Sequence, residues 1–159
     1  MKDNVGNEIH LGDFVYCYSG KHKNRIQQVH GFRVIHDEQL GELDAVNFSD
    51  KDWLRAANVV SLNALGVTAL PDVQWPLNRC DILGNPLHIG DKVMYMHRLE
   101  RDAETGVVKS MTDKSCLLSI QENWFGQTEY RKKYEELISL TALGKEDFTP
   151  APREYFSRW

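Results

Sequence analysis

The chain has 159 residues, of which 42% are hydrophobic and 26% charged, a composition typical of a globular domain. A chain of this length holds one ordinary domain or two modules of about 60–80 residues each. The formal net charge of −4 excludes a uniformly basic nucleic-acid-binding domain, although the local field at a binding face matters more than the sum.

No apolar run approaches the roughly 18 residues that a membrane span requires. The first residues, Met1-Lys2-Asp3-Asn4, lack the apolar segment of a signal peptide. We therefore expect a cytoplasmic protein with no membrane partner.

The cysteines and the catalytic motifs point away from metal sites and enzymatic chemistry. Cys17, Cys80 and Cys116 are odd in number, far apart, and form no C-x-x-C pair, so we expect free thiols. The sequence contains no Walker, Rossmann, G-x-S-x-G or H-E-x-x-H pattern. We expect no metal, no cofactor and no catalytic residue.

An internal repeat organises the chain. Residues 3–15 and 81–93 share the frame D-x-x-G-N-x-φ-H-φ-G-D-x-V, where φ is aliphatic, at an offset of 78 residues. Residues 59–66 match residues 137–144 at the same offset of 78. Two separate matches at one offset indicate a tandem duplication.

The repeat sets the expected domain boundaries. Module one covers residues 1–66 and module two covers residues 79–144. Residues 67–78 between them contain Pro71 and Pro76, which predict an extended and fairly stiff linker. A C-terminal tail of aromatic and basic residues occupies residues 145–159.

Short alternating runs bounded by Gly-Asn and Gly-Asp turns predict strands in both modules. In module one the expected strands are Phe14–Tyr18, Arg25–Val34, Ala45–Phe48 and Val59–Leu62. In module two they are Lys92–Met96, Gly106–Ser110, Ser115–Gln121 and Leu137–Leu140. Short helical turns are expected over Trp53-Leu54, capped by residues 49–52, and over Thr128–Glu136. The fold class is therefore mainly β, with each module a small, strongly bent barrel.

The opening G-N-x-φ-x-φ-G-D-x-V resembles the start of KOW-type modules, the Tudor-like small barrels of transcription elongation factors and ribosomal proteins. The resemblance covers about the first 18 residues of each module. Two such modules in a short chain are also similar to the MotB family of T-even-like bacteriophages, early DNA-binding proteins that modulate transcription. This resemblance implies sequence-tolerant binding of duplex DNA, nucleoid-type compaction in the host cell, and a homodimer.

Basic residues cluster in places where they could contact phosphates. The candidates are Lys21, His22, Lys23 and Arg25 in the first loop of module one; Arg98 and Arg101 in the equivalent loop of module two; Lys109 and Lys114 around a turn; and Arg131, Lys132 and Lys133 between Tyr130 and Tyr134. The alternatives are a solvated hairpin tip for the loop of module one, a salt-bridged loop for the equivalent loop of module two, and an ordinary exposed helical face for residues 131–133.

Three further features carry expectations. The tail residues Tyr155, Phe156 and Trp159 are expected to dock on a module or join a dimer interface, because exposed aromatic residues are costly. His10 and His88 correspond in the repeat, which suggests a structural role and not a metal site. Asp13 and Asp91 also correspond and are expected to accept backbone N–H bonds in their turns.

Three functions follow from these residues. The first is duplex DNA binding through basic loops. The second is a protein-interaction adaptor for RNA polymerase or a host nucleoid protein, with Tyr16, Tyr18 and Trp53 lining a groove. The third, an acidic mimic of DNA, is disfavoured because the net charge of −4 is mild and acids alternate with bases.

Overall fold

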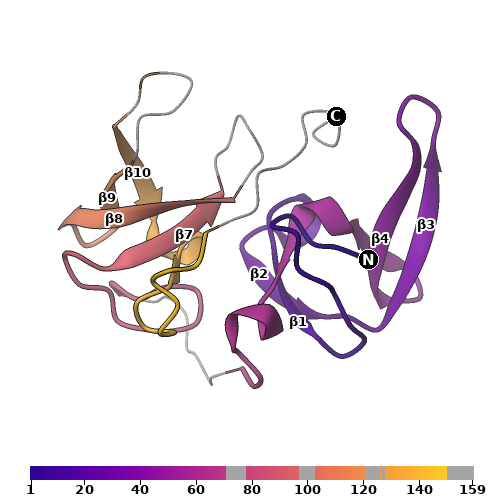
Figure 1. The fold of residues 1–159 in the computed structure, drawn as a ribbon, viewed down its shortest axis with the longest axis horizontal. Helices are drawn as coiled ribbons and strands as arrows, with labels where there is room; N and C mark the ends of the chain where they lie inside the picture. Colours follow the sequence, from indigo (N-terminus) through magenta and orange to yellow (C-terminus); the bar gives the residue numbers. More distant parts are fainter. Residues whose placement is uncertain (71–77, 97–102, 121–125, 127, 150–159) are drawn as a thin grey trace. The chain divides into compact units, whose positions relative to one another are not determined.

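The computed structural model describes residues 1–70, 78–96, 103–120, 126 and 128–149. It divides into two compact units: unit one lies within residues 1–68, and unit two within residues 69–149 (Figure 1). Helical structure in the described residues consists of short 3-10 turns, which confirms the prediction of a mainly β protein. Within those residues, no helix has the length and hydropathy needed to cross a bilayer.

Unit one contains two three-stranded antiparallel sheets. The first sheet has the order β2-β1-β6, formed by β1 (Phe14–Cys17), β2 (Arg25–Gln28) and β6 (Val59–Ser61). The second has the order β3-β4-β5, formed by β3 (Gly31–Asp37), β4 (Gly41–Ser49) and β5 (Asp52–Arg55). Single 3-10 turns cover Gly20–His22 (η1), Ala56–Asn58 (η2) and Asn63–Leu65 (η3).

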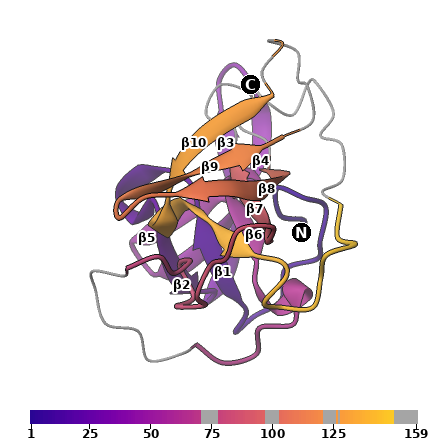
Figure 2. The same ribbon diagram turned by 90° about the vertical axis from the view of Figure 1, so that its left-hand side faces the viewer.

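Unit two contains one five-stranded sheet with the order β10-β9-β8-β7-β11, of which β10, β9, β8 and β7 follow one another in Figure 2. Its strands are β7 (Lys92–Met96), β8 (Ala103–Met111), β9 (Ser115–Ser119), β10 (Glu129–Lys133) and β11 (Ile138–Ser139). A 3-10 turn, η4 (Tyr134–Glu136), precedes the last strand.

Alternation along the strands builds a separate core in each unit. Val15 and Cys17 point to the same face of β1 and are fully buried, as their spacing predicts. They pack with Val46, Phe48 and other apolar residues of unit one. Unit two repeats the arrangement, with Val93 and Tyr95 of β7 in its core.

Both predictions of helix were wrong in their main part. Trp53 and Leu54 belong to β5, and residues 129–133 form β10, which is followed by the single turn η4. Each strand completes an antiparallel ladder, β5 on β4 and β10 on β9. Leu54 of β5 packs against the core through this pairing, and the gain in burial outweighs the local capping signal.

The predicted closure into a barrel is not seen, because in the described parts of the chain no sheet closes on itself. In unit one the predicted strand Arg25–Val34 is interrupted at Val29 and His30. The N–H of Val29 donates to the carbonyl of Asp13 (2.8 Å), whereas that of His30 donates to the carbonyl of Asn47 (2.8 Å). The chain therefore changes partner there and passes from one sheet to the other. In unit two, β8 instead continues through Gly106 and pairs with β7 and β9.

A buried aspartate joins the beginning of each unit to its last strand. In unit one, Asp3 accepts backbone N–H bonds from Val5 (3.0 Å), Asn7 (2.8 Å) and the distant Ser61 (2.7 Å). Burial raises the pKa of Asp3, while these backbone N–H groups act in the opposite direction. The carboxylate thus satisfies three backbone donors at once.

Unit two contains the same bonds 78 residues later. Asp81 accepts from the N–H of Leu83 (3.0 Å), Asn85 (2.8 Å) and Ser139 (2.7 Å). Burial raises the pKa of Asp81 as it does for Asp3, again against the pull of the backbone donors.

The second aspartate of the repeated frame fixes the following turn. Asp13 accepts from the N–H of His10 at 2.9 Å, and Asp91 accepts from that of His88 at 2.9 Å. This confirms the role that the sequence predicts for Asp13 and Asp91.

The three cysteines differ in reactivity. Burial raises the pKa of Cys17 to about 12 and that of Cys116 to about 11, and both side chains are inaccessible. Cys80 is half-buried, and its Sγ donates to the carbonyl of Asn78. Because the thiolate is the reactive form, we expect iodoacetamide at pH 8 to modify only Cys80 in the folded protein.

Mass spectrometry of the labelled protein checks this expectation, with the protein in urea as the control in which all three cysteines react. Fast modification of Cys17 or Cys116 without urea would contradict the buried positions of those thiols.

Candidate nucleic-acid interface

The sheet of unit two presents one solvent-exposed face, which we call the outer face of unit two. Residues directly opposite one another on antiparallel strands point to the same side. The register of β8, β9 and β10 therefore gathers on this face Val107, Ser110, Ser115, Leu117, Ser119, Glu129, Arg131 and Lys133. A bulge between Val108 and Ser110 leaves Lys109 without a strand partner, and its ion pair with Glu129 places it with this group. The opposite face carries Val108, Cys116 and Leu118 into the core.

Three cations lie on the outer face of unit two, together with the carboxylate of Glu129. Lys109 forms an ion pair with Glu129, and both side chains are exposed. Arg131 donates from Nη1 to Oγ of Ser115 (3.1 Å), which holds the guanidinium along the sheet. Lys133 is exposed on the same side of β10. The face is therefore positive although the whole chain is acidic.

The turn between β8 and β9 extends this positive region. Lys114 is exposed in the turn, and its backbone N–H donates to Oγ1 of Thr112 (3.4 Å). Asp113 in the same turn is paired with Arg79 at 3.0 Å, so its charge is offset locally.

Lys132 does not join this group, contrary to the expectation for a single basic cluster. Because residues 129–133 form a strand and not a helix, Lys132 points to the side opposite Arg131 and Lys133. Its Nζ lies 5.0 Å from the ring centroid of Tyr130 and 5.7 Å from that of Tyr95. The two rings stack on each other with centroids 5.7 Å apart.

The tyrosines around the basic run also point away from the outer face. Tyr130 packs against the core of unit two. Tyr134 is buried, and its hydroxyl donates to the carbonyls of Thr112 and Ser115. Because neither tyrosine ring lies on the outer face of unit two, neither can pack on a DNA sugar there.

The basic loop of unit one is partly engaged within the protein. Nε2 of His22 lies 2.5 Å from Oδ2 of Asp52, and its ring packs edge-on against Phe48. Nζ of Lys21 lies 3.2 Å from the other oxygen of Asp52. Burial of Asp52 acts to raise its pKa, but the bonds from His22 and Lys21 prevail and lower it. The half-buried His22 therefore has a structural role that the sequence did not predict.

Lys23 and Arg25 remain exposed at the end of this loop and the start of β2. Within the described residues, no ion pair engages either side chain. They are the two residues of the predicted loop with charges available for an external phosphate.

The sheet face of unit one that corresponds to the outer face of unit two was missed from the sequence. Register places Arg33, Ala45 and Arg55 side by side across β3, β4 and β5, with Trp53 next to them on β5. The guanidinium of Arg33 lies over the ring of Trp53 at 5.8 Å, and Trp53 is 40% exposed. The sequence contained one signal for this face: the 78-residue offset aligns Trp53 with Arg131 and Arg55 with Lys133.

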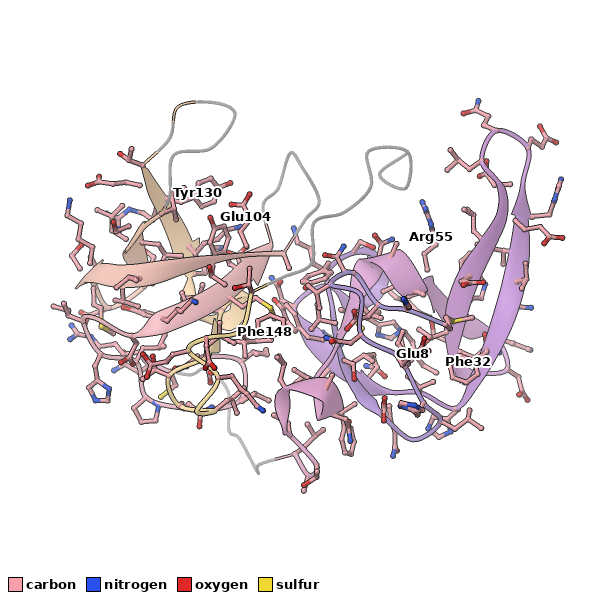
Figure 3. All side chains as sticks on the ribbon, in the orientation of Figure 1. Glu8, Phe32, Arg55, Glu104, Tyr130 and Phe148 are labelled. Atoms are coloured by element: carbon pink, nitrogen blue, oxygen red, sulfur yellow. The ribbon has the colours of Figure 1, made fainter. Side chains whose placement is uncertain are left out.

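Other expected contact residues have different positions. Tyr16 is buried and packs edge-on against Tyr18, so it does not line an open groove. Arg98, Arg101, Tyr155, Phe156 and Trp159 lie outside the described residues. The beginning of the tail is held by Lys92, whose Nζ donates to the carbonyls of Glu146 (2.5 Å) and Phe148 (3.4 Å); Phe148 is labelled in Figure 3.

In the part of the chain that the structure describes, no three histidine, cysteine or acidic side chains gather as metal ligands. Residues 79–139, which make up most of unit two, match a family described as a domain of unknown function (DUF7205). No curated protein matches the chain. The family match covers less than half of the sequence and lies entirely within the range of unit two.

Proposed function

We propose that this chain is a non-enzymatic protein that binds double-stranded DNA without sequence preference, through contacts with the phosphate backbone. The observation that carries the proposal is the outer face of unit two, where Lys109, Arg131 and Lys133 lie together with Glu129, and where Glu136 accepts the backbone N–H of Lys133 (3.0 Å). Charges of this kind are attracted to the dense negative charge of a duplex, whatever the base sequence.

The spacing of the cations suits a row of phosphates. Arg131 and Lys133 are two residues apart on β10, which separates them by roughly 6.8 Å along the strand. Adjacent phosphates of one DNA strand, which are offset by about 3.4 Å along the axis and also turn around it, are about 7 Å apart in space, a similar distance. A sheet face without a helix to enter the major groove favours backbone contact over base readout.

The repeated hydrogen bonds of Asp3 and Asp81, and the equivalent turns of Asp13 and Asp91, support the further proposal that the units are duplicated KOW-type modules. We propose on the resemblance noted above that the protein acts as a transcription modulator of the MotB kind, associated with the host nucleoid in a phage-infected cell.

Salt dependence tests the DNA proposal. Binding of a random-sequence duplex, measured by fluorescence anisotropy between about 50 and 200 mM salt, should weaken steeply. Each phosphate contact contributes about −0.9 to the log–log slope, so the R131A/K133A variant should lose about two units of slope. The K23A/R25A variant should flatten the slope by a similar amount if the loop of unit one also contacts DNA.

A matched K2A/K145A variant, in which two exposed lysines that belong neither to the outer face of unit two nor to the loop of unit one are removed, should keep the parental slope. An unchanged slope in R131A/K133A would remove the outer face of unit two from the interface. A parental protein that binds no duplex at either salt would contradict DNA binding itself.

A second candidate function, an adaptor for RNA polymerase or a host nucleoid protein, is favoured by exposed apolar side chains on unit one. Phe32 and Trp53 are each 40% exposed, and Val34 is 58% exposed. A pull-down from nuclease-treated bacterial lysate separates the two functions. Retention of polymerase that disappears with the nucleic acid would leave DNA as the ligand.

A further inference from the structure

Strand β3 forms one edge of its sheet and leaves a row of backbone hydrogen-bonding groups without a strand partner. The order β3-β4-β5 gives β3 a neighbour on one side, and no described strand pairs with its other side. Figure 1 shows β3 and β4 as a long hairpin that extends beyond the β1 and β2 strands of unit one. Such an edge is a template for pairing with another strand.

This edge lacks most of the features that proteins use to block edge pairing. The seven residues of β3, Gly-Phe-Arg-Val-Ile-His-Asp, contain no proline, and their register with β4 is continuous. Phe32 and Val34 are apolar and exposed on one side of the strand. Phe32 and Arg55, both labelled in Figure 3, lie on opposite faces of the sheet according to the register.

The charges on β3 are opposite in sign and symmetrically placed. Arg33 and Asp37 lie on the same side of the strand, two residues before and two residues after Ile35. We propose that β3 pairs antiparallel with β3 of a second copy of this chain, with Ile35 opposite Ile35. In this register Arg33 of each copy lies opposite Asp37 of the other, and Val34 lies opposite His36.

Neighbouring registers are less favourable. Centring the pair on Val34 places Arg33 opposite Ile35 and Asp37 opposite Gly31, so neither charge is paired. Centring it on Arg33 brings two guanidinium groups together, and a parallel in-register pair does the same. The register centred on Ile35 satisfies both charges of both copies, as a two-fold interface requires.

Both charged side chains are prepared for this contact. Oδ1 of Asp37 accepts from the N–H groups of Leu40 and Gln39, each at 2.9 Å, which leaves Oδ2 available to a partner. Those two backbone bonds lower the pKa of Asp37 and keep it ionised. Cζ of Arg33 lies 5.8 Å from the ring centroid of Trp53, and within the described residues no carboxylate forms an ion pair with this guanidinium.

The pairing assigns a specific strand, register and pair of charges to contact between two copies, which the resemblance alone does not give, and it does not depend on DNA binding. It would join two three-stranded sheets into one of six strands and bring the Arg33–Trp53 faces of both copies together. Dimerisation is measured without nucleic acid, so failure of one proposal is distinguishable from failure of the other.

Light scattering after size exclusion, over a range of concentrations of the full chain, tests the pairing. We expect the parental protein to be a dimer. R33D and D37R should each raise the dissociation constant of the dimer at least tenfold, because each variant places like charges opposite one another. The double variant R33D/D37R restores unlike pairs and should dimerise more tightly than either single variant, although it lacks the Asp37 acceptor for the N–H groups of Gln39 and Leu40.

An equimolar mixture of R33D and D37R should also recover the dimer, since all opposed positions then carry unlike charges. This recovery shows that each single variant is folded. R25D, a charge reversal on β2, is the matched control and should remain dimeric. A parental protein that stays monomeric, or single variants that dimerise as well as it does, would overturn the proposal.

Discussion

Replacement of Asp81 by alanine is expected to lower the free energy of unfolding of unit two by about 3–5 kcal/mol. The substitution leaves the buried N–H groups of Leu83, Asn85 and Ser139 without their acceptor. A buried donor without a partner costs about 1–3 kcal/mol. Urea denaturation followed by circular dichroism should show the loss as a shift of the midpoint by more than about 1 M.

Two variants make this result specific. D81N retains one carbonyl oxygen for two of the three donors but presents its amide to Ser139, so its loss should be smaller than that of D81A. D113A removes a carboxylate that is 87% exposed, and its stability should change by less than about 0.5 kcal/mol. A D81A protein as stable as D113A would show that the buried carboxylate does not hold the unit together.

The second large effect is expected at Gly106, where β8 continues from its pairing with β7 to its pairing with β9. A Cβ at this position would lie 3.0 Å from Cγ2 of Ile120, 3.2 Å from the carbonyl oxygen of Ser119 and 3.3 Å from Cβ of Leu118. The side chain of Ile120 can rotate away, but the backbone oxygen is fixed by the sheet. We expect Gly106→Ala to destabilise unit two by about 1–3 kcal/mol through overpacking.

The urea midpoint of G106A, compared with that of S110A on the same strand, measures this effect. Ser110 is exposed, so its substitution changes neither the core nor the ladder. Equal midpoints for the two variants would contradict this prediction. They would mean that β8 and β9 can move apart around Gly106 without loss of stability.

The sequence was sufficient for the features that depend on local chemistry. The Gly-Asp turns, the strand after each turn and the burial of Val15 with Cys17 follow from short-range patterns, and the structure contains them. The helices expected around Trp53 and over Thr128–Glu136 failed because a capping signal is weak beside the hydrogen bonds of a ladder. The strand break at Val29 could not be predicted, since it depends on the distant carbonyls of Asp13 and Asn47.

The sequence predicted which basic residues belong to the candidate interface, but not how they are arranged. Arg131 and Lys133 were identified, but their separation from Lys132 follows only from the two-residue period of a strand. His22 was counted among the contact residues because its partner, Asp52, lies 30 residues away and is invisible to a local reading. Arg33 and Trp53 were missed as a pair for the same reason, since β3 and β5 meet only through β4.

The bond between Asp3 and Ser61 has a consequence for how the protein folds. It joins residues that are 58 positions apart, so unit one contains a contact of very high sequence separation for its size. Loop closure of this length is slow, and the formation of β6 against β1 is a late, long-range event of the kind that sets folding rates of β proteins. During synthesis, Asp3 lacks this last donor until Ser61 has left the ribosome. Strand β1 therefore has one edge without a partner until residues 59–61 emerge and pair with it.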